Sequence, residues 1–185
     1  KRMHIKKGGL EYLSALMLFC LIGLLFMFSL NSRHLGFTQK RLRDALDTAC
    51  LSAAIVDEND YREKGVMRLN NNPSWLRYLF YNTLKNNLNL DNNLKPVNDE
   101  MFDGIKIHSF VLYYIQDGFL YEYAFGQDYN FAVNKKVYTG NEKTPDGKQI
   151  VSATVYGDIG MNIETFLGIK EYVHLQSSVD VVDTE

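Results

Sequence analysis

The stretch Leu10–Leu30, LEYLSALMLFCLIGLLFMFSL, decides which architecture this chain can adopt. It contains 21 residues and a single charged side chain, Glu11, at its edge. An α-helix rises about 1.5 Å per residue, so a helix of this length crosses a hydrocarbon core of about 30 Å. The stretch therefore predicts one transmembrane helix over residues 10–30, and the lipid bilayer is the first partner that we expect.

The charges before this stretch predict its orientation. Residues 1–9 contain four cations and no anion, which is the pattern that keeps a short N-terminal segment on the cytoplasmic side. We therefore expect residues 1–9 to form a short basic cytoplasmic end. The expected location is the cell membrane, crossed once, with the C-terminal part of the chain extracytoplasmic.

A cleaved secretory signal is the competing interpretation of the same pattern. The apolar core of a signal peptide is about 7–15 residues long and leads to a cleavage site with small residues at alternate positions. Here the apolar stretch is longer, and its exit Phe28–Ser32 reads FSLNS, without an A-x-A sequence. Both features favour a permanent anchor over cleavage.

The charge of the remaining chain argues against nucleic acid as a partner. The formal net charge of the chain is −2. Residues 1–30 have a net charge of +3, and the residues after Leu30 contain 16 cations and 21 anions, a net charge of −5. Binding to phosphates requires clustered Lys and Arg, so a mildly acidic domain is poorly suited to it. With 12 Tyr and 11 Phe in the chain, we expect one domain whose sheet is rich in tyrosine.

A second helical pattern follows the apolar stretch. Its apolar positions are spaced 4, 3, 4 and 3 residues apart and form one stripe on a helix; they are Leu42, Leu46, Ala49, Ala53 and Val56. Small neighbours such as Ala45 and Cys50 would let another element approach this helix closely. A single glycine, Gly36, costs about 1 kcal/mol without ending a helix. We predict an amphipathic helix over residues 31–57, continuous or nearly collinear with the transmembrane helix.

The two cysteines lie thirty residues apart on this predicted helical segment. Cys20 and Cys50 would be separated by about 45 Å along a helix, far beyond the reach of a disulfide bond. Two interpretations remain, namely that both are small residues in helix packing, or that Cys50 forms a bridge to another molecule.

Residues 58–104 are predicted to form a polar insert that contains a second helix, over residues 73–88. Asn72 can cap this helix and Pro73 suits its first turn. Its apolar face consists of Leu76, Leu79, Phe80, Thr83, Leu84 and Leu88.

From residue 105 onward the apolar period changes to two, which predicts an antiparallel β domain over residues 105–185. Asp117-Gly118 is a strong signal for a hairpin turn. The expected strands cover residues 105–115, 119–125, 130–138, 149–163 and 171–182. Helices followed by antiparallel strands indicate the α+β class, with the amphipathic helix packed on the C-terminal sheet.

The sequence contains no motif for catalysis or for binding a metal or cofactor. The four histidines lack paired-ligand spacing, and no P-loop or GxSxG sequence is present. The acidic run Asp57–Asp60 lacks the ligand spacing and glycine of a calcium loop. We therefore expect a protein that is not an enzyme and that uses no cofactor.

Three segments resemble a known family. The start Lys6-Lys7-Gly8-Gly9-Leu10-Glu11-Tyr12 is similar to that of type IV pilin-like proteins, with Glu11-Tyr12 matching the Glu-Tyr or Glu-Phe pair of tight-adherence pilins. Residues 42–54 resemble the alanine-rich stretch that follows the membrane helix in TadE/TadG-like proteins. Val155–Leu167 followed by Glu171–Val182 is similar to the end of such proteins.

This resemblance implies a TadE-like pseudopilin, a structural or assembly component of a surface pilus, secretion or conjugation apparatus. Its implied partners are other pilin-like subunits or assembly-platform membrane proteins, contacted through the N-terminal helix. The implied processing and assembly residues are Gly8, Gly9, Glu11 and Tyr12. In the family the glutamate follows the cleavage glycine by five residues, whereas Glu11 follows Gly9 by two, which points to an uncleaved membrane-resident component.

Two other functions are compatible with the sequence. One is an anchored extracytoplasmic binding module that forms no fibre, with the tyrosine-rich strands over Val111–Phe125 as its contact surface. The other is an enzyme that acts on the cell envelope, for which no motif is present.

Overall fold

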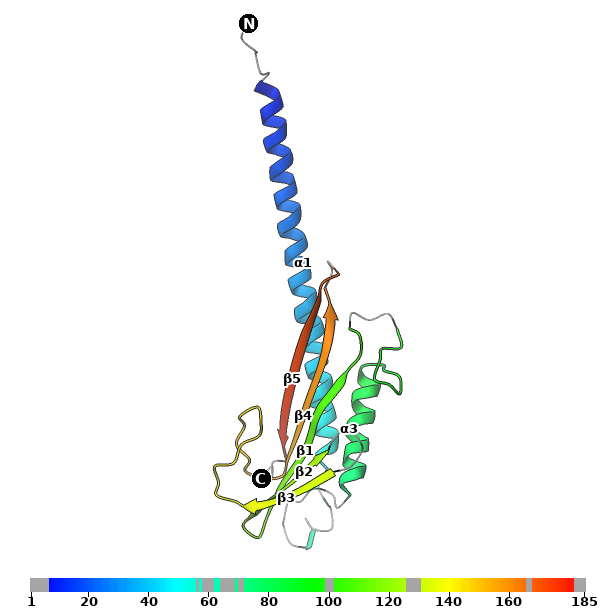
Figure 1. Cartoon of the computed structure of the whole chain (residues 1–185), viewed down its shortest axis with the longest axis vertical. Coiled ribbons are helices and arrows are strands. Elements are labelled where there is room, and N and C mark those ends of the chain that lie inside the picture. Colours follow the sequence, from blue (N-terminus) through cyan, green and yellow to red (C-terminus); the bar gives the residue numbers. More distant parts are fainter. Residues whose placement is uncertain are drawn as a thin grey trace.

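The computed structural model describes residues 7–55, 57, 62–63, 69, 72–98, 102–125, 131–165 and 168–181. It confirms the α+β class, with a long N-terminal helix and a five-stranded antiparallel sheet (Figure 1). The elements are α1 (Lys7–Ala53), α3 (Pro73–Asn87), β1 (Lys106–Gln116), β2 (Phe119–Phe125), β3 (Phe131–Val137), β4 (Thr154–Glu164) and β5 (Lys170–Asp180).

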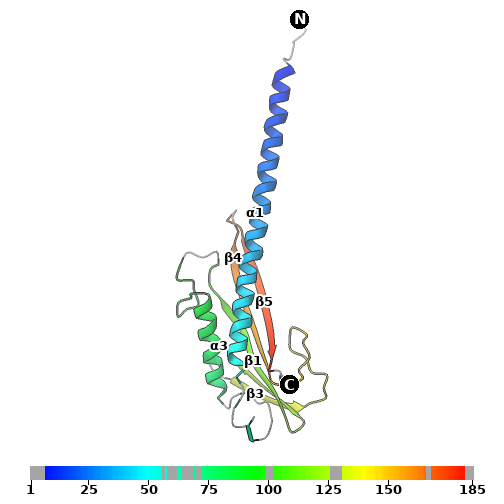
Figure 2. The ribbon, with the colours of Figure 1, turned by 180° about the vertical axis from the view of Figure 1, so that it is seen from behind.

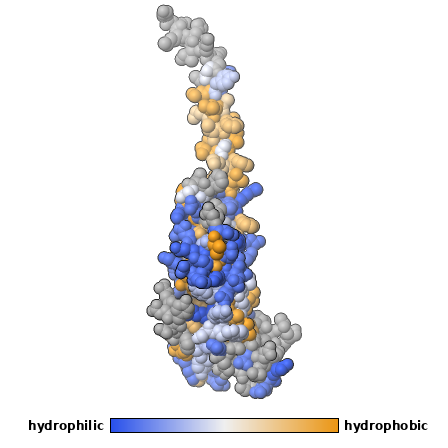
Figure 3. Space-filling model, turned by 90° about the vertical axis from the view of Figure 1, so that its right-hand side faces the viewer, coloured by the Kyte–Doolittle hydropathy of each residue, from blue (hydrophilic) through white to orange (hydrophobic). Residues whose placement is uncertain are grey.

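The predicted membrane and amphipathic segments form one helix. α1 is continuous over 47 residues, and its first half extends beyond the folded domain in both ribbon views (Figures 1 and 2). The large apolar side chains from Leu13 to Phe26 are 56–76% exposed, and they stand clear of the hydrophilic surface of the domain (Figure 3). Within the described residues, α1 is the one helix that is long and apolar enough to span a membrane.

The sheet has the strand order β3-β2-β1-β4-β5, and all neighbouring strands are antiparallel. The predicted turn between β1 and β2 is confirmed, because Asp117 and Gly118 have φ angles of 51° and 77°, as a type I′ hairpin requires. β4 and β5 form a long hairpin that pairs from Thr154 with Asp180 to Glu164 with Lys170. This hairpin is the part of the sheet on which α1 packs.

The predicted stripe of α1 is where the helix meets the sheet. Leu42, Leu46, Ala49 and Ala53 are all 0–1% exposed, whereas Val56 lies outside the described residues. The facing residue on β4 is Gly157, where a Cβ atom would lie 2.9 Å from Cys50 Sγ and 3.1 Å from Leu46 Cδ1. Small residues on both elements therefore allow the helix to approach the sheet backbone closely.

The second helix belongs to the same core. In α3, Leu76, Phe80 and Leu84 are buried, and the ring of Phe80 stacks on Phe110 of β1 with 4.4 Å between centroids. The predicted cap is present, since Asn72 Oδ1 accepts a hydrogen bond from Trp75 N at 3.0 Å. α1 and α3 lie side by side on one face of the sheet (Figures 1 and 2), so the segment predicted as an insert contributes to the main core.

Two predicted boundaries are wrong. α1 ends at Ala53 rather than near Asp57, because Ala54 N bonds to Leu51 O at 3.1 Å, an i−3 bond that tightens the last turn. The strand predicted from Gln149 begins only at Thr154. Residues 142–150 instead form a small hairpin of their own around Pro145–Gly147, in which Thr144 N bonds to Lys148 O and Ile150 N bonds to Glu142 O, both at 2.8 Å.

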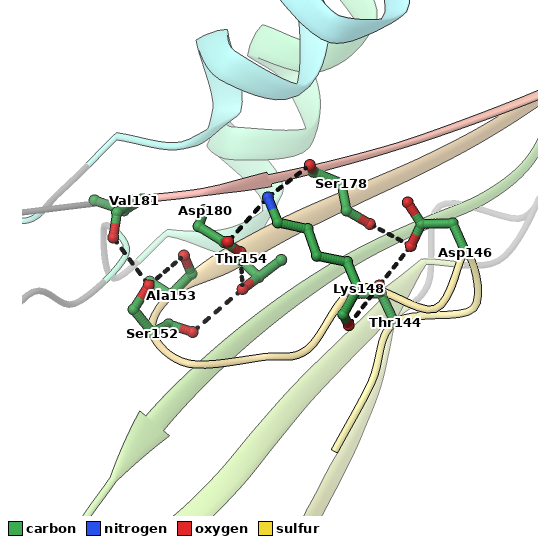
Figure 4. Close-up of polar contacts among 9 residues, drawn as sticks. All are labelled: Thr144, Asp146, Lys148, Ser152, Ala153, Thr154, Ser178, Asp180 and Val181. Atoms are coloured by element: carbon green, nitrogen blue, oxygen red, sulfur yellow. Dashed lines mark hydrogen bonds and ion pairs between the residues drawn. The ribbon is translucent and has the colours of Figure 1, made fainter. Parts of the chain in front are cut away.

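This small hairpin covers the other face of the sheet. Ile150 joins a second buried cluster, whose further members are Val111, Tyr113, Leu120 and Tyr156. Polar contacts fasten the loop to the end of β5 (Figure 4). Lys148 Nζ lies 2.9 Å from Asp180 Oδ2, and Ser178 Oγ donates to Asp146 Oδ1 at 2.6 Å. The central strands are therefore shielded from water on both faces.

The close contact at Gly157 predicts that the stability of the protein depends on the volume of the side chain at this position. We expect Gly157→Ala to lower the free energy of unfolding by about 1–3 kcal/mol, because the added methyl group overfills a packed site. Chemical denaturation in detergent micelles measures this change. The matched control is Gly36→Ala in α1, where a Cβ atom meets nothing within 4 Å. Adding Cys50→Ala to Gly157→Ala should restore part of the loss, and an unchanged stability in Gly157→Ala would contradict the packing.

Candidate functional site in the exposed half of the long helix

The residues implied in processing and assembly lie at the free end of α1. Gly8, Gly9, Glu11 and Tyr12 are all within the helix, and Gly9, Glu11 and Tyr12 are exposed, with the Tyr12 side chain at 84%. In the described part of the chain no cation forms an ion pair with Glu11, although its backbone oxygen accepts a hydrogen bond from Ser14 Oγ at 2.9 Å. The structure thus places this group far from the sheet, on a surface open to another molecule.

The chemistry of this end depends on its surroundings. A carboxylate drawn toward the bilayer centre costs a few kcal/mol, and less when it stays in the interface. Glu11 lies at the first turn of the apolar segment, so it can remain among headgroups while the residues after it enter the hydrocarbon core. Moving deeper, as in a packed bundle of helices, requires a cationic partner that offsets the loss of hydration.

The two cysteines have different environments. Cys20 is exposed on the apolar half of α1, whereas Cys50 is fully buried. Burial raises the pKa of the Cys50 thiol to about 12, and the Sγ atom lies 3.9 Å from Ser177 O of β5. A buried thiol of this kind is unreactive, so Cys50 is a packing residue and the intermolecular bridge proposed for it is wrong.

The predicted tyrosine-rich contact surface is largely taken up by contacts within the sheet. Tyr114 stacks on Tyr121 with 4.7 Å between ring centroids and on Tyr123 with 5.7 Å. Tyr113 is buried on the other face, and this burial raises the pKa of its hydroxyl to about 12. These rings therefore serve mainly as cross-strand packing.

A pocket beside α3 was not anticipated from the sequence. It has a volume of about 480 Å³ and is lined by Ser74, Arg77, Tyr78, Tyr81, Asn82, Lys85, Asn92 and Phe125. The Arg77 guanidinium lies over the Phe125 ring, 5.6 Å from its centroid, and Lys85 Nζ donates to Asn92 Oδ1. Among the described residues, the lining of this α3 pocket combines two cations and three aromatic rings and contains no carboxylate.

The structure also brings together two histidines that are distant in sequence. His108 Nε2 lies 2.6 Å from Tyr172 Oη, and His174 Nε2 lies 2.5 Å from Asp158 Oδ1. These four side chains, His108, Tyr172, His174 and Asp158, form a polar cluster. Its members His108 and Tyr172 lie over Gly160, where a Cβ atom would collide with both. Among the described residues no group of three or more His, Cys, Asp and Glu side chains could hold a metal ion. The cluster thus links β1, β4 and β5 through polar contacts.

Comparisons with known proteins identify no relative. No model of a protein family matches the chain, and neither a characterised protein nor a solved structure is similar to it.

Proposed function

We propose that this protein is a membrane-anchored, TadE-like pseudopilin, a structural or assembly component of a surface pilus, secretion or conjugation apparatus. The observation that supports this proposal best is that the two halves of α1 differ in their exposure. One continuous helix of 47 residues has an exposed apolar first half and a second half whose apolar stripe is buried against the sheet. Such a helix can pack against equivalent helices in a membrane or fibre while its sheet faces outward.

The proposed topology is a single crossing of the cell membrane. The cations of residues 1–9 support a cytoplasmic N-terminus, and the folded domain then lies on the extracytoplasmic side. In this arrangement Glu11 is close to the cytoplasmic interface, and Tyr12 occupies the interfacial zone that tyrosine favours. The protein acts through helix contacts in this proposal, without catalysis or a cofactor.

Assembly would place Glu11 opposite a cation of a neighbouring subunit, such as an amino group near its N-terminus. The exposed face of the apolar helix contains Phe19, at 76% exposure, and Cys20, both available for contact with a neighbouring helix. Partners are other pilin-like subunits or polytopic assembly-platform proteins.

Replacing Glu11 tests this proposal. A photo-cross-linking amino acid at Phe19 should capture a second copy or another pilin-like subunit in native membranes, as identified by mass spectrometry. Glu11→Ala should reduce this capture about tenfold or more, because a charge-assisted hydrogen bond contributes about 1.5–3 kcal/mol. Extraction with alkaline carbonate should show that the variant remains membrane-inserted.

The matched control is Ser14→Ala, one turn further along the same helix, which should leave the capture unchanged. Equal capture with and without the Glu11 carboxylate would contradict the proposed pairing. Capture of no helical membrane protein at all would contradict the assembly function itself.

The α3 pocket supports a second candidate, an anchored binding module without a fibre. Pockets of about 300–1,000 Å³ with apolar walls and a few polar groups are typical of ligand sites, and the volume here is about 480 Å³. Because Arg77 and Lys85 are its charged lining residues, the fitting ligand is an anion with an aromatic or apolar part, such as an acidic peptide with one aromatic side chain.

This second candidate makes its own prediction. Calorimetric titration of the full-length protein with a short acidic peptide that contains one phenylalanine should show saturable binding. Arg77→Gln combined with Lys85→Gln should weaken it at least tenfold, by removing two charge-assisted contacts. Lys136→Gln on β3, which changes the net charge outside the pocket, should have little effect. Binding that responds equally to all three changes would reflect net charge and would exclude the pocket as the site.

A further inference from the structure

The end of the β4–β5 hairpin, where Glu164 pairs with Lys170, lies further along α1 toward its N-terminus than the rest of the sheet (Figures 1 and 2). The turn is closed by hydrogen bonds from Ile169 N to Thr165 Oγ1 at 3.2 Å and from Gly168 N to Thr165 O at 2.9 Å. Gly168 adopts a φ of 72°, which a glycine accepts without strain. The turn is thus held at the end of a ladder that pairs the whole of β4 with β5.

The register of helix and sheet places this turn near the end of the apolar segment. Gly157 lies against Leu46 and Cys50. The seven residues from Gly157 to Glu164 span about 23 Å of strand, which corresponds to about 15 residues of helix. The end of β4 at Glu164 is therefore level with about residue 33 of α1.

The exposed fractions of the α1 side chains independently support placing the end of β4 near the end of the apolar segment. On one face of α1, Met27 and Leu30 are 42% and 45% exposed, against 56–76% for the large apolar side chains from Leu13 to Phe26, whereas Phe28 on another face is still 70% exposed. Both residues belong to the last turns of the apolar segment. Leu35, one turn or so later, already packs against the main core. The folded domain therefore begins to cover α1 while the apolar segment still continues.

The side chains at this level suit the boundary between lipid and water. Ile169 is 62% exposed at the turn, Tyr172 is 54% exposed on β5, and Phe37 is 69% exposed on α1. Arg33, at the same level of α1, is exposed, and Lys170 forms an ion pair with Asp103 at 2.9 Å. Aromatic side chains are enriched in the interface, and cations there are attracted to anionic headgroups.

We propose that Ile169, at the end of the β4–β5 hairpin, is a second membrane contact and lies in the outer headgroup layer of the bilayer that α1 crosses. The proposal rests on the membrane anchor of the proposed function. Residue 33 lies three residues, or about 4.5 Å of helix, beyond Leu30, and a headgroup layer is about 5–7 Å thick, so the end of the hairpin is at the depth of this layer when α1 spans the bilayer. The second contact fixes the tilt of the domain, and it thereby sets the direction in which the sheet and the α3 pocket face.

Lipid quenching of a fluorophore at Ile169 tests this contact in the full-length protein. Ile169→Cys is prepared with Cys20→Ser, labelled with an environment-sensitive probe, and reconstituted in vesicles of phosphatidylcholine and phosphatidylglycerol. The buried Cys50 thiol, with its raised pKa, stays unlabelled. We expect blue-shifted emission that is quenched by lipids with a spin label near the headgroup.

Two further label sites make the result unambiguous. Val151→Cys, at the opposite end of the β4–β5 hairpin and 61% exposed, should stay unquenched. Leu21→Cys, in the middle of the apolar segment, should be quenched by deep spin labels. Quenching at Leu21 without quenching at Ile169 would overturn the second contact and leave the anchor intact, whereas no quenching at Leu21 would overturn both.

Discussion

The close approach of α1 to β4 is the contact on which the rest of the structure depends. Gly157 has no side chain, so Leu46 and Cys50 can lie directly against the strand backbone. The helix stripe that makes this contact is continuous with the apolar segment, because α1 has no break between them. The stripe buried in the domain core and the apolar segment are therefore parts of one continuous helix.

This continuous helix links the proposed functions. In the proposed arrangement, the helix has exposed apolar side chains at one end and a buried stripe at the other, and its tilt and rotation would be passed on to the sheet. Contacts made by Glu11 in an assembly would then orient the outer domain at the far end of α1. Ile169 at the outer headgroups would restrict the tilt of the same helix through a second membrane contact. In this proposal, both the assembly and the presentation of the domain depend on the geometry of one helix.

The sequence predicted the features that depend on local period. The apolar length of residues 10–30, the stripe from Leu42 to Ala53 and the Asp117-Gly118 turn all have periodic or turn signals, and all are present. The boundary near Gln149 was mispredicted because an apolar alternation does not reveal that those backbone groups bond to residues 142–144 instead. The α3 pocket and the His108–His174 pair depend on how distant segments pack, which a single sequence does not encode in any local pattern.

The central claim is that one unbroken helix joins the membrane to the core of the domain. Spin labels at Ser14→Cys and Arg43→Cys, both exposed positions on α1, with Cys20→Ser, measure this directly by pulsed electron resonance in lipid nanodiscs. A continuous helix predicts a single narrow distribution centred near about 44 Å, from 1.5 Å per residue. A broad distribution or a clearly shorter distance would show a hinge between the two halves and would contradict the account.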